Sequence, residues 1–410
     1  MNIYQIIIVV ALLGSAFLDI IADTLNLRRL STELPDEFKG VHDSESYARS
    51  QEYSRINTKF DWISSTTGLV ILFIFWGAGG FAALHTWVEG LNWHLVPTGV
   101  LYIFVLLAGR TLIKLPFRIY STFVIEERFG FNRTTPKTFI LDMIKSALVG
   151  AVIGIPLLAA ILFLFDWAGD WGWLYGWAVT TVVLLAIQFV APRWIMPLFN
   201  KFKPLQDQEL KEKIERMADS ADFPVRDVSE MDGSRRSSKA NAFFAGFGRN
   251  RRIALFDNLI ANHSQDEIVA VLAHEIGHFR GKHIPLNMAI GIAHAGVLFY
   301  LLSIFLEHPG LFEAFYITDQ QPVYAGLVFF SLLYHPIEMV LSFLIGMMSR
   351  HHEFAADRFA KDLIGNGRVL ADALKKLSRD SLANLTPHPF YVFLNYSHPP
   401  VLERIRRLNE

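Results

Sequence analysis

Seven stretches of the chain are long and apolar enough to cross a lipid bilayer, which takes roughly 20 residues of helix. Polar segments separate these stretches. The first stretch lacks the charged start and the small-residue cleavage site of a signal peptide, so we interpret it as a retained helix. The pattern therefore predicts a mainly α-helical membrane protein with seven transmembrane helices. The predicted spans are residues 3–25, 62–86, 97–117, 137–165, 173–195, 284–306 and 323–348.

The Lys and Arg residues of the connections lie on one predicted side of the membrane. The connections after the second, fourth and sixth spans contain none, whereas 201–282 and the C-terminal tail contain many. Positively charged loops stay in the cytoplasm. The distribution therefore predicts that the N-terminus lies outside and that 201–282 and the tail are cytoplasmic.

Two polar regions, one after the fifth span and one after the seventh, are large enough to fold. Together they hold about 140 residues, enough for one small domain built from two pieces of sequence. A helical pattern at 207–220 and a strand-like run at 251–256 predict that this domain contains a small β element. The polar segment 26–61 is expected to pack against it. The predicted parts are 1–200 with five spans, 201–283 as the first domain piece, 284–348 with two spans, and 349–410 as the second piece.

Composition narrows the class of protein and the kind of site. Hydrophobic residues make up 52% of the 410 residues, charged residues only 19%, and the mean hydropathy is +0.31. These values exclude a disordered chain, a coiled coil and an ordinary cytosolic enzyme. A net charge of −1 gives no basic field for nucleic acid. The absence of cysteine restricts any zinc site to His, Asp and Glu ligands.

The chain contains an H-E-x-x-H pattern. On a helix, His274 and His278 lie one turn apart on the same face and can bind one metal ion. Glu275 lies beside them, placed to take a proton from water rather than to bind the metal. A capping box at 264–267 and a stop at Gly281 predict that this segment is helical. The alternative is a pair of surface histidines on an amphipathic helix.

A zinc site needs a third protein ligand. Its best candidates lie in 350–357, at the cytoplasmic end of the seventh span. If the helix continues there, Glu353 and Asp357 share a face, so that Glu353 could bind zinc and Asp357 could orient a liganding histidine. His351 and His352 are competing ligands on the same grounds. A solvated helix face is the alternative without metal.

Several separated motifs occur in an order that is typical of one family. They are 126–132 (EERFGFN), 232–243 (DGSRRSSKANAF), 274–278 (HEIGH), 353–357 (EFAAD) and 395–400 (NYSHPP). Over nearly its whole length, the chain resembles the type I CAAX prenyl proteases, which are gluzincin-like integral-membrane zinc metalloendopeptidases.

This resemblance implies seven helices around a large water-filled chamber, with the zinc domain closing its cytoplasmic end. It implies that Glu353 is the third ligand of one Zn²⁺ per chain. It also implies that His398 donates a hydrogen bond to the oxyanion formed during hydrolysis. Asn241 and Ala242 would belong to the substrate-binding edge, where a strand binds an extended peptide by β-augmentation.

Charged residues inside membrane spans are expensive and by default indicate function. We expect Asp19, Arg110, His335 and Glu338 to line the wet chamber rather than to serve transport.

These observations predict a membrane-embedded zinc endopeptidase with the bilayer and an extended, lipidated or hydrophobic peptide as its partners. One alternative is a quality-control protease for damaged membrane proteins. Another is a seven-helix transporter or receptor with a structural metal. The compact length favours a bacterial inner membrane, and a eukaryotic owner would place the chain in the endoplasmic reticulum.

Overall fold

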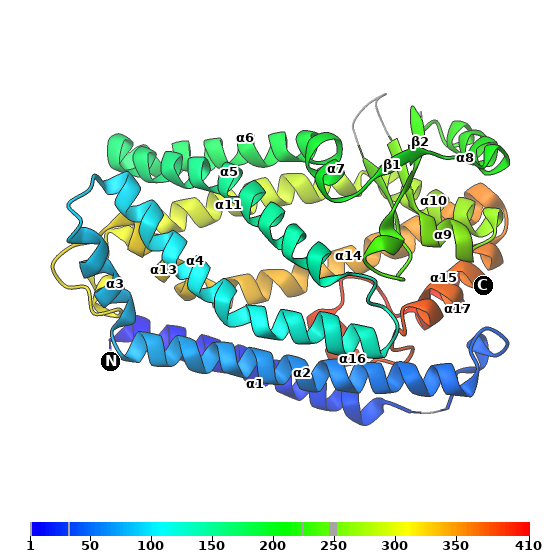
Figure 1. Cartoon of the computed structure of the whole chain (residues 1–410), viewed down its shortest axis with the longest axis horizontal. Helices are drawn as coiled ribbons and strands as arrows, with labels where there is room; N and C mark the ends of the chain where they lie inside the picture. Colours follow the sequence, from blue (N-terminus) through cyan, green and yellow to red (C-terminus); the bar gives the residue numbers. More distant parts are fainter. Residues whose placement is uncertain (1, 32, 224, 246–251) are drawn as a thin grey trace.

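The computed structural model describes residues 2–31, 33–223, 225–245 and 252–410. Long helices run side by side along most of an elongated molecule (Figure 1). A small sheet lies at one end with the helices that surround it, and the N-terminus lies toward the opposite end. The apolar helices and the polar sheet region are therefore separated along the long axis.

Within the described residues, five helices are long and apolar enough to cross a membrane, and one bent pair of helices would make a sixth. The mainly helical membrane architecture is confirmed. Counted in this way, the described residues give at most six spans, whereas the sequence predicted seven. One of the five, Pro136–Phe199, contains two helices that pack against each other, α5 (Pro136–Ala168) and α6 (Gly172–Val190). The other four are α1 (Ile3–Arg29), α2 (Ser44–Gly77), α4 (Leu95–Tyr120) with its continuation to Glu126, and α11 (His283–Leu306).

The last predicted span, 323–348, is not one straight helix. The structure divides it into α13 (Val323–Leu333) and α14 (His335–Ile364), which are bent by 54°. Pro336 lies in the first turn of α14 and has no N–H to continue the hydrogen bonds of α13. Beyond the span, α14 continues without a break through 350–357, as the third-ligand hypothesis requires.

The second span also differs from its predicted range of 62–86. Helix α2 begins earlier, because the Asp43 side chain accepts a hydrogen bond from Ser46 N at 2.6 Å and caps its first turn. It ends at Gly77, and Gly79 has a φ of +74°. This left-handed conformation favours glycine and starts a separate helix, α3 (Gly80–Glu89).

A four-stranded sheet is formed by residues that the structure describes. Its spatial order is β1 (Phe202–Pro204), β2 (Asp227–Met231), β4 (Arg252–Phe256) and β3 (Ala242–Ala245). Strands β2 and β4 are parallel, whereas β1 and β3 pair antiparallel with their neighbours. In this part of the chain, β3 is therefore an edge strand.

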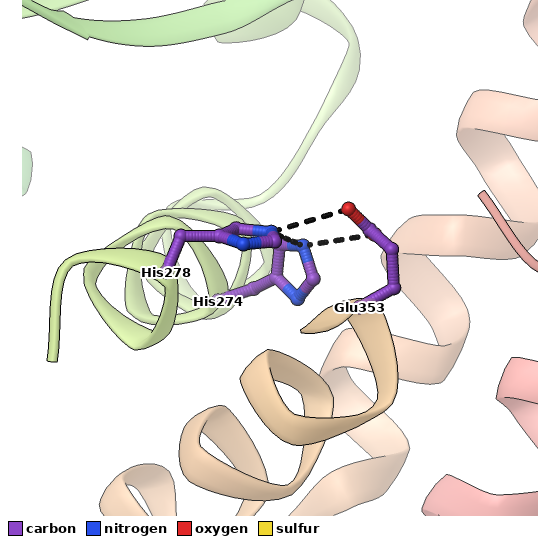
Figure 2. A group of neighbouring side chains, drawn as sticks. All are labelled: His274, His278 and Glu353. Carbon is purple, nitrogen blue, oxygen red and sulfur yellow. Dashed lines mark hydrogen bonds and ion pairs between the residues drawn. The ribbon is translucent and has the colours of Figure 1, made fainter. Parts of the chain in front are cut away.

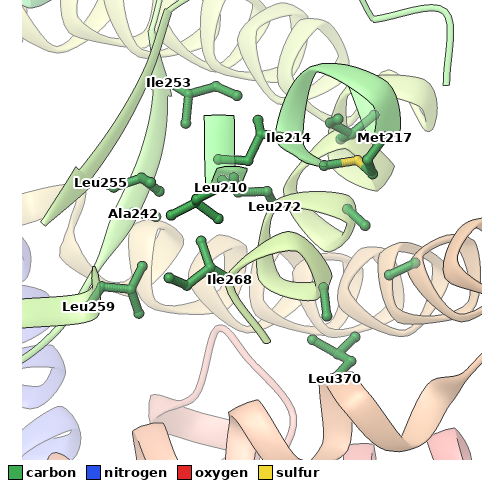
Figure 3. Close-up of a cluster of buried hydrophobic side chains, with 14 of the residues drawn as sticks. Leu210, Ile214, Met217, Ala242, Ile253, Leu255, Leu259, Ile268, Leu272 and Leu370 are labelled. Atoms are coloured by element: carbon green, nitrogen blue, oxygen red, sulfur yellow. The ribbon is translucent and has the colours of Figure 1, made fainter. Parts of the chain in front are cut away.

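The sheet shares one hydrophobic core with helices from both polar regions (Figure 3). These helices are α8 (Gln208–Ser220), α10 (Gln265–Arg280) and α15 (Gly367–Asp380). Phe38 and Tyr47 are fully buried in the same cluster, so the expectation that 26–61 packs here is confirmed. Among its central side chains are Leu210, Ile214, Ile253, Leu255, Ile268, Leu272 and Leu370.

Gly277 allows α10 and α14 to pack at very short distance. A Cβ at this position would lie 2.9 Å from Ala356 Cα and 3.0 Å from Ala356 O, both backbone atoms. We expect Gly277→Ala to destabilise the fold by about 1–3 kcal/mol and to lower the amount of metal bound per chain. Thermal unfolding in detergent and metal analysis would measure both. Gly291→Ala, where no atom lies within 4 Å of the new Cβ, is the control and should change neither.

Candidate metal centre and active site

The H-E-x-x-H residues lie on α10, which starts at its predicted capping box. Ser264 Oγ accepts a hydrogen bond from Glu267 N at 3.3 Å, and the Glu267 carboxylate accepts one from Ser264 N at 2.9 Å. Gly281 is the C-cap, as predicted. The ring centroids of His274 and His278 are 4.8 Å apart, so helical spacing places both imidazoles side by side on one face of α10.

Helix α14 carries Glu353 to the two histidines, as Figure 2 shows. The Nε2 atom of His278 lies 3.2 Å from His274 Nε2 and 3.2 Å from Glu353 Oε1. The Nε2 atom of His274 lies 3.4 Å from Glu353 Oε2. Among the described residues, these three side chains form a group whose ligand atoms lie within 4.8 Å of one another.

The donor set and its spacing fit a metal ion. Ligand atoms that bind tetrahedral zinc at 2.0–2.1 Å lie roughly 3.3–3.4 Å from one another, close to the separations in this group. Glu353 Oε2 is buried and makes no hydrogen bond, although His274 Nε2 and Arg404 Nη1 lie 3.4 and 3.3 Å from it. A buried carboxylate oxygen normally has a hydrogen-bond partner, and a metal ion bound by this oxygen would take the place of one. Two imidazoles and one carboxylate leave a fourth position open for water or substrate.

Asp357 and Arg404 form a buried pair behind His274. The Nδ1 atom of His274 lies 2.9 Å from Asp357 Oδ1. Arg404 Nη2 donates to Asp357 Oδ1 at 2.7 Å and Arg404 Nε to Oδ2 at 2.8 Å, in bidentate geometry. Arg404 Nη1 also lies 3.3 Å from Glu353 Oε2. Asp357 thus contacts His274, and its role in orienting this histidine stays a prediction.

This pair sets the electrostatics of the site. Burial works to lower the pKa of His274, but its contacts with the carboxylates of Asp357 and Glu353 outweigh burial and raise that pKa above its usual value. Burial also works to lower the pKa of Arg404, and its hydrogen bonds to Asp357 outweigh this effect and raise that pKa. Arg404 therefore stays charged and balances one of the two buried carboxylates.

We expect Asp357→Asn to weaken zinc binding about 10–100-fold, because the carboxylate that orients His274 becomes a neutral amide. Competition with a chelator would measure the affinity. Asp362→Asn, an exposed carboxylate one turn further along α14, is the matched control. Equal zinc affinity in both variants would contradict the orienting role of Asp357.

Sequence reasoning missed two residues of this site. Arg404 lies on α17 (Val401–Asn409), in a tail segment with no motif of its own. His283 Nδ1 lies 3.0 Å from His278 Nδ1, and its ring stacks on His352 with centroids 4.0 Å apart. The sequence does contain a signal for His283, because it is a third histidine shortly after the helix that carries His274 and His278. Of the competing ligands, His352 is stacked in this way and His351 is exposed.

Glu275 directly follows His274 on α10, whereas His398 reaches the metal group from the tail. The Glu275 side chain is half-buried. His398 Nε2 lies 3.3 Å from Glu353 Oε1, and its side chain is 63% exposed. Ser397 Oγ is within 2.9 Å of His398 Nδ1. The tail therefore brings an accessible imidazole to the metal group, and its role as an oxyanion donor stays a prediction.

Asn241 and Ala242 lie at the start of the edge strand β3. Asn241 is exposed, and its side-chain oxygen accepts a hydrogen bond from Ala242 N at 2.8 Å. Asn241 O accepts one from Phe256 N at 3.1 Å. The expected edge strand is thus present, with one side paired to β4.

Three of the four intramembrane charges share a cavity of about 200 Å³. Asp19 on α1 and both His335 and Glu338 on α14 line it. Glu338 Oε2 lies 3.3 Å from His294 Nε2 on α11. Arg110 is exposed and does not line this cavity. A polar surface between these helices is therefore present, and the larger chamber stays a prediction.

Known proteins resemble this chain over nearly its full length. Residues 23–201 match the family model described as "CAAX prenyl protease N-terminal, five membrane helices", and residues 204–410 match peptidase family M48. The CAAX prenyl protease 1 homolog of Arabidopsis thaliana is 36% identical over 403 residues, which cover 94% of this chain and 93% of that protein. CAAX prenyl protease 1 of Saccharomyces cerevisiae is 35% identical over 403 residues, with coverage of 92% and 89%. The crystal structure of S. mikatae Ste24p matches with a TM-score of 0.94 and 33% identity over 100% of both chains.

These similarities confirm the resemblance and the peptidase class. The relatives named here are eukaryotic, so they give no support to the bacterial preference drawn from chain length. Their membrane helices and the metal-binding group agree with the fold and the site described above. The chain therefore belongs to peptidase family M48, as a membrane metallopeptidase with the N-terminal region of the CAAX prenyl proteases.

Proposed function

We propose that this chain is a zinc endopeptidase that cleaves an extended, lipidated or hydrophobic peptide of the CAAX type. The observation that carries this proposal is the group of His274, His278 and Glu353, with Glu275 next to His274 in the sequence of α10. The relatives named CAAX prenyl proteases supply the substrate class. The partners are then this peptide and the lipid bilayer, and nucleic acid is not among them.

We infer that the chain crosses the membrane seven times. Helices α5 and α6 contain 33 and 19 residues, each enough for one crossing, and they pack against each other. The bent pair of α13 and α14 supplies the last crossing. The Lys and Arg distribution places 201–283, 349–410 and the active site in the cytoplasm and the N-terminus outside. Relatives from eukaryotes favour the endoplasmic reticulum membrane.

The residues of the site have separate roles in peptide hydrolysis. Zinc, when bound, polarises the peptide carbonyl and lowers the pKa of water. Glu275 takes the proton of the attacking water and delivers it to the leaving amine. His398 donates a hydrogen bond to the oxyanion of the tetrahedral intermediate. The exposed fraction of His398 suits this role, because a donor to substrate must be reachable.

The free edge of β3 would hold the peptide backbone. An edge strand offers unpaired N–H and C=O groups to an extended peptide. Asn241 lies at the start of this edge, and its side chain hydrogen-bonds Ala242 N. We expect the Asn241 amide to turn to the substrate backbone when a peptide is bound, which frees Ala242 N for pairing.

The test is cleavage of two peptides that differ only in a farnesyl group on the CAAX cysteine. Detergent-purified protein with about one zinc per chain should cleave the farnesylated peptide with the higher kcat/KM. Equal cleavage of both, together with cleavage of unrelated membrane peptides, would favour the quality-control protease. A zinc-loaded protein that cleaves none of these peptides would contradict the proposal, and the structural-metal alternative would then account for the site.

A further inference from the structure

The motif at 126–132 lies outside the metal site, and its role is unexplained by the chemistry above. It follows a π-helical turn, Ser121–Glu126, that extends α4, and it precedes α5. Such π-helical turns are frequent at functional sites. Its loop reaches the polar domain and contacts the segment directly upstream of β3.

Two backbone hydrogen bonds join this loop to the upstream segment in strand-like pairing. Ser238 N donates to Phe131 O at 3.1 Å, and Arg133 N donates to Arg236 O at 3.1 Å. Between them, Asn132 and Ser237 form an antiparallel bridge. The loop thus acts locally as a short strand laid against residues 236–238.

The alternation of the backbone shows which edge the loop occupies. Asn258 lies two residues after the end of β4. Its side-chain Nδ2 donates to Ser237 O at 3.2 Å and to Lys239 O at 2.9 Å. Asn241 O faces β4 through its bond to Phe256 N. Odd-numbered residues therefore point their backbone groups toward β4, and even-numbered residues point theirs to the opposite edge.

The loop and the proposed substrate edge therefore lie on the same side of the chain between Arg236 and Phe244, which bends at Ser238 before β3 begins. Its upstream part, at Arg236 and Ser238, is occupied by the loop. Its downstream part, at Ala242 and Phe244, has no strand partner among the residues that the structure describes. A peptide that pairs with β3 and extends upstream therefore reaches the loop at Ser238.

A partly buried polar contact holds the loop in this place. Lys239 Nζ lies 3.0 Å from Tyr53 OH and 3.3 Å from Glu126 Oε2, and Tyr53 OH also donates to Glu126. The same ammonium lies 4.3 Å from the ring centroid of Phe131, and the Tyr53 and Phe131 rings are in edge contact at 5.2 Å. Helix α2, the loop and the strand segment are thus held together.

We propose that the loop at 129–133 is a stop that limits the length of substrate on one side of the scissile bond. A peptide residue opposite Ala242 can be followed by about three more residues, at roughly 3.3 Å each, before it reaches Phe131 opposite Ser238. Lys239 is a positioning residue for this stop. This inference rests on the proposed function, because it assumes that the free edge of β3 binds the peptide.

Binding of a peptide length series to zinc-loaded Glu275→Gln protein tests the stop without turnover. A fluorescent core peptide is extended by one to six Gly-Ser residues at its N-terminus or at its C-terminus, and anisotropy gives Kd. Extension at one end should leave Kd within about threefold. Extension at the other end beyond about three residues should weaken binding about tenfold, because the added residues must leave the edge or displace two hydrogen bonds.

Variants that weaken the contact of Lys239 with Tyr53 and Glu126 test whether the loop sets that limit. Lys239→Met should reduce the tenfold loss to less than about threefold while zinc stays at one per chain, and Tyr53→Phe should act in the same direction. Lys213→Met, which removes an ion-paired lysine on α8 of the same domain, should keep the full loss.

Three results would overturn the inference. Equal tolerance of extension at both ends would remove the stop. An unchanged length limit in Lys239→Met and Tyr53→Phe would place the limit elsewhere. Absence of binding by any peptide would overturn both the inference and the proposed function, whereas a core peptide that binds with a flat length series would overturn the inference alone.

Discussion

Glu275→Gln is expected to lower kcat about 10²–10⁴-fold, the range for loss of a positioned general base. The amide keeps the size of the side chain but cannot accept the proton of the attacking water. Glu275 is outside the three-residue metal group, so zinc should stay at about one per chain. Cleavage of the farnesylated peptide and zinc quantification on the same preparation would measure both properties.

Glu212→Gln is the matched control, because it makes the same change to an exposed carboxylate on α8 that lies outside the metal group. Its activity should stay within about threefold of wild type. Equal cleavage by wild type and Glu275→Gln would remove Glu275 from the mechanism, and zinc loss in Glu275→Gln would make it a ligand or a structural residue.

Local patterns predicted the part of the site that lies on one helix. The spacing of His274 and His278, the capping box and the stop at Gly281 are all read within α10. Helical periodicity alone places the two imidazoles together. No long-range contact is needed for this step, which is why the structure agrees with it closely.

The identity of the third ligand depends on how α14 packs against α10, and a single sequence does not reveal this packing. Spacing alone makes Glu353, His351 and His352 competing candidates, because all three lie on one turn of the helix. The close contact of Gly277 with Ala356 fixes the rotation of α14 against α10 and directs Glu353 to the histidines. Arg404 comes from a tail helix, and no pattern in that helix indicates which interior group it reaches.

Hydropathy identified where apolar helices occur but not how they begin or bend. Helix α2 extends into the polar segment because Asp43 caps it. The polar residues there lower the mean hydropathy of a window, so hydropathy does not detect this part of the helix. The bend before α14 follows from Pro336, which hydropathy averages over. The stop loop at 129–133 was visible only as a motif, because its pairing with 236–238 joins distant parts of the chain.

Glu353→Gln is expected to remove zinc and peptidase activity together. Glu353 supplies the single carboxylate of the group, and a neutral amide is a weaker zinc ligand than a carboxylate. We expect the zinc affinity to fall by more than the 10–100-fold that loss of an outer partner such as Asp357 causes. Chelator competition on the folded, metal-free protein would measure this, with cleavage of the farnesylated peptide at saturating zinc as the second readout.

Glu403→Gln is the matched control for Glu353→Gln. Glu403 is an exposed carboxylate on α17 beside Arg404, so its loss should change neither zinc affinity nor activity. Zinc retention by Glu353→Gln at wild-type affinity would instead assign the third ligand to His398, whose Nε2 lies 3.3 Å from Glu353 Oε1. Together with Glu275→Gln, this variant distinguishes the roles of two carboxylates in one site. One variant should lose the metal and the other should keep it, although both lose catalysis.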